Sequence, residues 1–156
     1  MAHLLIPQPS DPVLPVFFNV DAVVGAPPAS NLREDVLLVQ LAFKILALRP
    51  VASTPPTLVA AASAVEITGS IDQATIIAIR KLQETLRDKN GPAQVVDGRV
   101  SRAQGGFSYG GGSTWTIVQL NNIIQDRHKH IWPRIDKIPG CPGELQKMVV
   151  RTVAGV

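Results

Sequence analysis

The sequence is short of the residues that build disulfide frameworks and metal centres. Of its 156 residues only Cys141 is a cysteine, which excludes an internal disulfide framework and a multi-cysteine zinc site. Two of the three histidines, His128 and His130, are spaced i, i+2, so a regular helix would place their rings on different sides. We therefore expect no metal site and no cofactor. Near a helix C-terminus, both imidazoles would instead suit the helix dipole as cations.

Long apolar runs and an ordinary secretion signal are also missing. The most apolar run, residues 36–48, contains Gln40 and Lys44 and is too short and too polar to cross a bilayer. No lysine or arginine precedes Arg33, which argues against a signal peptide. We expect no membrane insertion and a chain that is cytoplasmic as synthesised. Another machine would have to deliver it to the periplasm or the cell wall.

Charged residues make up 17% of the chain and aromatic residues 4%, against 46% hydrophobic residues. This composition predicts one folded domain with a mainly aliphatic core. Residues 1–78 hold three basic and six acidic side chains, whereas residues 79–156 hold twelve and six. A basic second half suits an anionic partner. Nucleic acid is not the expected one, because the chain has no block of like charges and no basic stretch interleaved with aromatics.

No recognisable catalytic set is present. Cys141 lies in a Pro-Gly-Cys-Pro-Gly turn without the local signature of a catalytic cysteine. The glycine-rich segment 105–112 precedes a predicted helix but lacks the lysine of a phosphate-binding loop, so we interpret it as a flexible insertion. The twelve carboxylates are scattered along the chain. We expect a protein that is not an enzyme.

Proline separates an extended arm from a helical body. Residues 1–30 hold six of the 13 prolines and two short apolar runs, which predicts an extended arm with one or two short strands, packed on the body or on a partner. The body is expected over 31–131, and residues 132–156 form a C-terminal extension with a short helix. Helical periodicity predicts helices near residues 32–48, 58–65, 73–88, 114–131 and 143–153.

The helix boundaries follow from capping residues. Asn31 with Glu34 forms a capping-box pattern for the first helix, which is apolar on nearly all sides and should be central and buried. Asp72 is placed to cap the helix at 73–88, and Ser113 or Thr114 the helix that follows. On the helix at 73–88 an outward i, i+4 pair is expected between Arg80 and Glu84, and an inward apolar row at Ile76, Ile79, Leu82 and Leu86.

A turn-and-helix pattern occurs twice. Thr68-Gly69-Ser70-Ile71 leads into the helix at 73–88, and Asp97-Gly98-Arg99-Val100 precedes the helix at 114–131. Glycine permits the positive φ of a tight turn, and the apolar residue two positions later, Ile71 or Val100, should fill the core. A threonine then opens each helix.

These residues resemble the peptidoglycan-binding-domain family, a three-helix module of bacterial and phage cell-wall enzymes. The likeness covers roughly residues 31–125 and begins with a Val-x-x-Leu-Gln-like pattern in the first helix. It implies a mainly α fold, a small three-helix bundle of the peptidoglycan-binding-domain type with a Pro-rich extended N-terminal arm and an extra C-terminal helix. The sequence departs from the family at Thr68, Asp72 and Ser101, and in an insertion over 104–113. The matching residues are Gly69, Ile71, Thr75, Ala78, Ile79, Leu82 and Gln83 in the first copy, and Asp97, Gly98, Val100, Thr114, Trp115 and Leu120 in the second.

The resemblance implies a non-catalytic bacterial module that binds peptidoglycan or its fragments. Such a ligand calls for hydrogen-bond donors, positive charge and one or two aromatic rings in a shallow groove. The candidates near the second turn are Arg99, Arg102, Tyr109, Trp115, Gln83 and Asn121. An alternative is a protein-interaction or structural subunit that reuses the fold, such as a phage component or the cargo of an injection or secretion system, docked through its N-terminal arm. A wall hydrolase is disfavoured because the catalytic set is missing.

Overall fold

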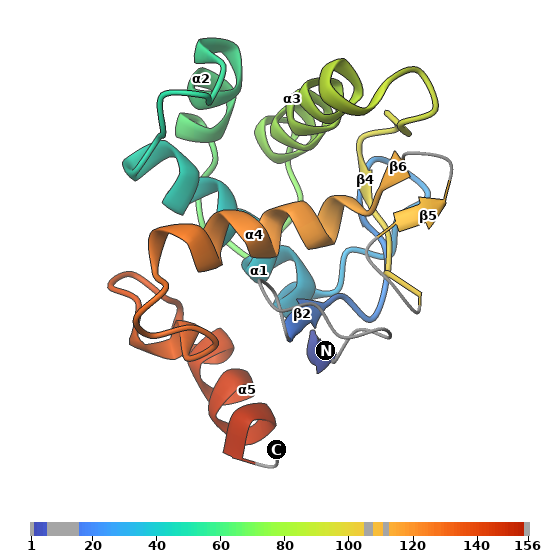
Figure 1. The fold of residues 1–156 in the computed structure, drawn as a ribbon. Helices are drawn as coiled ribbons and strands as arrows, with labels where there is room; N and C mark the ends of the chain where they lie inside the picture. The colour runs from blue at the N-terminus through green and yellow to red at the C-terminus, as the bar shows by residue number, and fades with distance from the viewer. Residues whose placement is uncertain (1, 6–15, 105–107, 111–112, 155–156) are drawn as a thin grey trace.

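The computed structural model describes residues 2–5, 16–104, 108–110 and 113–154, and this part of the chain is mainly helical (Figure 1). The helices are α1 (Arg33–Leu48), α2 (Pro56–Ser63), α3 (Gln73–Asn90), α4 (Thr116–Arg127), the 3-10 turn η1 (Ile135–Lys137) and α5 (Gly143–Ala154). The helix α1 contacts α2 and α4, and α2 contacts α3. The last helix, α5, lies with η1 at the opposite end of the molecule from α2 and α3.

The first helix is the centre of the core, as its apolar composition predicts. Val36, Val39 and Phe43 are fully buried, and neighbours lie against α1 from α2, α4 and α5. Its C-terminal residue Leu48 is 73% exposed, because the chain leaves the core there at Arg49-Pro50. None of the described helices is long and apolar enough to cross a membrane.

The start of α1 differs from the prediction. Asn31 does not cap it: this residue has φ 51°, its side-chain oxygen accepts from the backbone N–H of Gly25 at 2.7 Å, and its amide donates to the carbonyl of Gly25 at 3.2 Å. Helix α1 begins after Leu32 without a side-chain cap. The asparagine therefore holds the preceding arm, because a carboxamide can pair with both polar groups of one residue.

The start of α3 agrees with the prediction. The Asp72 carboxylate accepts from the backbone N–H of Thr75 at 2.8 Å and caps the helix. On the outer face, Glu84 pairs with Lys81 at 3.0 Å rather than with Arg80, so the expected i, i+4 ion pair is corrected to an i, i+3 pair.

The buried side of α3 follows the predicted row only in part. Its described residues Ile79, Leu82 and Leu86 are buried, whereas Ile76 is half-buried. Of the two apolar residues that follow the turn glycines, Val100 is fully buried and Ile71 is half-buried against the edge of the core.

Helix α4 is shorter than predicted at both ends. It begins at Thr116, not Thr114, because Ser113–Thr114 forms the strand β6, which pairs with β5 (Ser108–Gly110). The Gln94 side chain pairs with both backbone groups of Thr114, at 2.9 and 3.0 Å, and keeps it extended. The helix ends at Arg127, before the Trp132-Pro133 stop.

The arm packs on the helical body through short strands. The strand β1 (His3–Leu5) pairs with β2 (Phe17–Asn19), and β3 (Val24–Gly25) pairs with β4 (Arg99–Val100). Phe17 and Phe18 are fully buried. The described part of the arm therefore contributes to the core.

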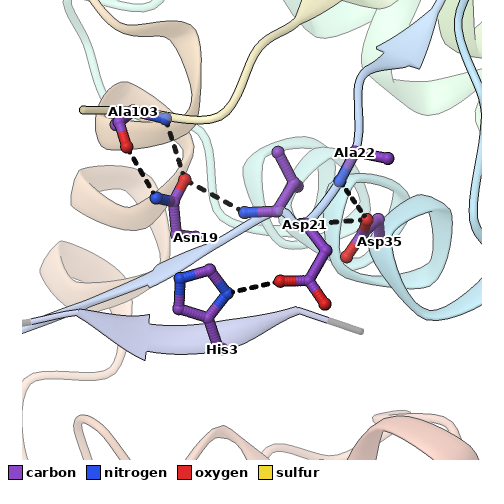
Figure 2. A network of polar contacts seen from close by, with 7 residues as sticks. His3, Asn19, Asp21, Ala22, Asp35 and Ala103 are labelled. Carbon is purple, nitrogen blue, oxygen red and sulfur yellow. Dashed lines mark hydrogen bonds and ion pairs between the residues drawn. The ribbon is translucent and has the colours of Figure 1, made fainter.

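Carboxylates and carboxamides fasten the arm (Figure 2). Asn19 pairs with both backbone groups of Ala103 at 2.9 Å, and Asp35 of α1 accepts the backbone N–H groups of Asp21 and Ala22. His3 bonds to the Asp21 carboxylate at 2.7 Å across the strand pair. Burial raises the pKa of Asp35, and these backbone hydrogen bonds partly oppose the rise.

The C-terminal extension packs along α1 and β1. Leu145, Met148 and Val149 of α5 are buried. At the surface, the Glu144 carboxylate accepts from Arg33 at 2.9 Å, and this contact lowers the pKa of Glu144. Since both side chains are about half-exposed, the apolar contacts hold the helix more than this ion pair does.

Candidate functional site

Two buried glutamines organise the two glycine turns. In the first turn, the Gln40 oxygen of α1 accepts from the backbone N–H groups of Thr68 and Gly69, both at 2.9 Å. Its amide donates to the Ser70 carbonyl at 3.0 Å and to the Thr75 hydroxyl, in the first turn of α3, at 3.3 Å. One side chain thus joins a helix, a turn and the start of the next helix.

The second turn is held in the same way. The Gln83 oxygen of α3 accepts from the backbone N–H groups of Asp97 and Gly98 at 3.0 and 2.9 Å. Its amide donates to the Arg99 carbonyl at 2.8 Å and to the Thr116 hydroxyl at 3.1 Å. Gly69 and Gly98 both have positive φ, 77° and 71°, as the repeated pattern requires.

This geometry revises one pairing of the repeat. By hydrogen bonding, the counterpart of Thr75 is Thr116, two residues after the Thr114 that the sequence pattern suggested. The apolar positions agree, because Leu120 and Ile123 then correspond to Ile79 and Leu82, and all four are buried.

Three of the six predicted binding residues use their side-chain polar groups in hydrogen bonds within the fold. Gln83 is 1% exposed and holds the second turn. Asn121 is 1% exposed and pairs with both backbone groups of Phe18, at 2.7 and 2.8 Å. Arg99 donates to the carbonyls of Ala26 and Pro27 in the arm. Their polar groups stabilise the fold, so we do not assign them to a ligand.

The other three predicted residues lie in different settings. Trp115 is 9% exposed and belongs to the core. Arg102 is exposed on the segment after β4. Tyr109 lies in β5, but its side chain is outside what the structure describes, as is all of Phe107.

A groove of about 800 Å³ lies elsewhere, between the C-terminal end of α1, the connection that leads into α2, and the facing sides of α3 and α4. No sequence motif predicted this groove. Its floor is aliphatic and its rim is polar. The aliphatic lining is Leu46, Val51, Pro55, Leu58, Leu82, Leu86 and Ile123, and the polar lining is Ser53, Thr54, Thr85, Asp88, Lys89, Gln119, Asn122, Gln125, Asp126 and Arg127.

Three carboxamides of α4 line this groove. Gln119, Asn122 and Gln125 are half-buried, and their side chains form no hydrogen bond with a described residue. By contrast, Gln40, Gln83 and the buried asparagines bond to the backbone. Because half-buried amides keep strong donors and acceptors, the groove offers three groups to a bound molecule.

Charged groups of both signs surround the groove. Asp88 and Lys89, at the end of α3, are exposed and form no ion pair with a described residue. Arg127 donates to the Arg49 carbonyl and Arg49 to the Arg127 carbonyl, both at 3.0 Å, which ties the C-termini of α1 and α4 together. Asp126 pairs with Lys129 at 3.6 Å at the outer rim.

The histidine after α4 lies in surroundings that disfavour the charge that the sequence suggested. His128 is 6% exposed, and burial and the neighbouring Arg49 lower its pKa. A lowered pKa favours the neutral imidazole over the cation expected at this helix end. The side chains of Arg49 and Arg127 donate to backbone carbonyls at the C-terminal ends of α4 and α1 instead.

The described residues offer little other chemistry. No group of three or more histidine, cysteine or acidic side chains among them is placed to hold a metal ion. Burial raises the pKa of the Cys141 thiol to about 12, which keeps it protonated and unreactive near neutral pH.

Comparison of the chain with protein families, with curated proteins and with solved structures finds no match. We therefore infer the function from the residues and their arrangement.

Proposed function

We propose that this chain is a non-catalytic bacterial module that binds peptidoglycan, built as a three-helix bundle of α1, α3 and α4 with an added arm and C-terminal helix. The observation that carries the proposal is the duplicated glutamine-anchored turn. It gives a common physical role to motif residues such as Gly69, Gly98 and Gln83, on which the likeness to the peptidoglycan-binding-domain family depends. Because these residues stabilise the fold, the binding groups must lie elsewhere.

The groove supplies a place for the ligand. Its volume of about 800 Å³ is in the range of ligand-binding sites, roughly 300–1,000 Å³. An aliphatic floor with a few polar groups at the rim is also typical of such sites. The half-buried amides of Gln119 and Asn122 suit the many hydrogen-bonding groups of peptidoglycan.

Pull-down with purified sacculi tests the proposal. The wild-type chain should co-sediment with sacculi. Thr85→Trp should abolish or strongly reduce this, because Thr85 is half-buried in the groove wall and the larger ring would fill it. Thr57→Trp is the matched control, since Thr57 is exposed on α2 and does not line the groove. Failure of the folded wild-type chain to co-sediment would refute the proposal.

A second candidate is a protein-interaction subunit that reuses this fold. It is favoured by two exposed apolar side chains at this end of α1: Val51, which lines the groove and is 42% exposed, and the neighbouring Leu48, which is 73% exposed. The described part of the arm offers less support, because Phe17, Phe18 and Val20 are fully buried in this chain. A wild-type chain that is folded but does not bind sacculi would favour this candidate.

A further inference from the structure

We infer that the groove binds the stem peptide of peptidoglycan and not its glycan strand. This inference depends on the proposed function, and it specifies which part of the polymer makes the contact. Stem peptides are short chains in which alanine alternates with acidic and diamino residues. They therefore present methyl groups, peptide groups, carboxylates and an ammonium group.

The groove lacks the feature that a sugar ring would use. All the residues that line it are described, and none of them is aromatic. Aromatic rings offer the flat apolar surface on which a sugar face can stack. The floor is formed by branched aliphatic side chains, including Leu58, Leu82 and Ile123. Such a surface accommodates small methyl groups better than a pyranose ring.

The chain itself shows how carboxamides bind an extended peptide. Asn19 pairs with both the N–H and the carbonyl of Ala103, Asn121 does the same with Phe18, and Gln94 with Thr114. In each case one carboxamide forms the pair of backbone hydrogen bonds that a neighbouring strand would otherwise form. Gln119 and Asn122 carry the same group, have no described partner, and lie one helical turn apart on the groove wall. They are equipped to pair with peptide groups of a bound chain.

The charges around the groove complement a peptide with ionic groups of both signs. Lys89 has no described ion-pair partner and can attract a carboxylate. Asp88 beside it, also without a described partner, can attract the ammonium group of a diamino residue. The glycan strand of intact peptidoglycan has no ionic group that could pair with either charge, because its lactyl carboxyl groups are amide-linked to the peptides.

The experiment measures how the full chain binds three different probes. Intact sacculi and sacculi stripped of stem peptides by an amidase are tested by co-sedimentation, and a free Ala-γ-Glu-diaminopimelate-Ala tetrapeptide is tested by calorimetry. We expect binding to intact sacculi and to the tetrapeptide, and loss of binding to stripped sacculi. The variants Gln119→Ala and Asn122→Ala should each weaken tetrapeptide binding about three- to tenfold, as expected for one hydrogen bond.

The control variant is Gln73→Ala. Gln73 is an exposed amide at the start of α3, outside the groove, and its side chain has no described partner. It should leave the affinity for the tetrapeptide unchanged, and melting curves confirm that each variant is folded. Equal losses from Gln73→Ala and Asn122→Ala would overturn the assignment of the groove amides.

The outcomes separate this inference from the proposed function. Equal binding to intact and stripped sacculi would overturn the inference and leave peptidoglycan binding intact. No binding to intact sacculi would overturn both. The comparison of wild-type binding to the three probes needs no variant, so it tests the inference even where a substitution disturbs the fold.

Discussion

Gln83→Ala removes a side chain that forms hydrogen bonds with three backbone groups at once. The substitution leaves the N–H groups of Asp97 and Gly98 and the carbonyl of Arg99 without their partner, and it also removes the bond to the Thr116 hydroxyl. We expect a large loss of stability. In the native state of the variant these buried groups would lack a partner, whereas in the unfolded chain they form hydrogen bonds with water.

The magnitude follows from the burial of these groups. An unsatisfied buried donor or acceptor costs about 1–3 kcal/mol. Gly98 is buried, whereas Asp97 and Arg99 are half-buried, so water can replace part of what their backbone groups lose. We expect Gln83→Ala to lower the free energy of unfolding by about 2–4 kcal/mol on this basis. Gln40→Ala should give a loss of similar size, since it serves the equivalent groups in the first turn.

Urea unfolding followed by circular dichroism measures both losses, with an unchanged m-value as evidence that the transition stays two-state. Gln119→Ala is the matched control, because its half-buried amide has no described partner, and its effect should stay within about 0.5 kcal/mol. A loss below about 1 kcal/mol for both Gln40→Ala and Gln83→Ala, less than one unsatisfied group, would refute the reasoning.

Three further predictions concern the core and two buried titratable groups. Leu82→Ala should cost about 2–5 kcal/mol in urea unfolding, because Leu82 is 2% exposed and would leave a cavity; a loss below about 0.5 kcal/mol would place it at the surface. Burial raises the pKa of Asp35 from its ordinary value of 3.8, so the native state binds this proton more tightly than the unfolded state. Its contribution to stability is present below pH 3.8 and is lost as the pH rises through the raised pKa; in urea titrations, Asp35→Asn should remove this pH dependence, and an unchanged profile would contradict the assignment. Cys141, with its pKa raised to about 12, should react with a maleimide at pH 7.5 only after unfolding, and rapid labelling of the native chain would show that the thiol is accessible.

The sequence predicted the helices well where local signals decide them. The apolar composition of residues 36–48 was sufficient to place α1 at the centre of the core. Asp72 set the start of α3 through a cap that spans three residues. Both signals act within one or two helical turns, and distant parts of the chain do not override them.

The prediction failed where a distant segment competes for a side chain. Asn31 is of a residue type that often caps helices, but its carboxamide pairs with Gly25 in the arm. Thr114 resembles a helix start, but Gln94 holds it in a strand, so that Thr116 begins α4. A single sequence does not show these partners, because the pairing depends on how the arm and the turns meet in three dimensions.

The groove could not be found from a motif, since its walls come from α1, α2, α3 and α4. One signal was present: Gln119, Asn122 and Asp126 recur at i, i+3 and i+7 on α4, which gives that helix a polar stripe. Such a stripe is also the ordinary solvent-facing side of a helix. Only the half-burial of its two amides, beside the aliphatic floor of the groove, distinguishes this stripe from a solvent-facing one.

The candidate residues chosen by side-chain type show why hydrogen-bond partners matter more than type. Gln83 and Asn121 were selected because amides suit a polar ligand, yet both are buried and bonded to the backbone. Gln119 and Asn122 carry the same chemical group and lack a described partner. A buried amide that changed partners to bind a ligand would leave backbone groups unsatisfied, at a cost of about 1–3 kcal/mol each. An amide without an internal partner has no such cost, so the groove amides can contribute their full hydrogen-bonding capacity to recognition.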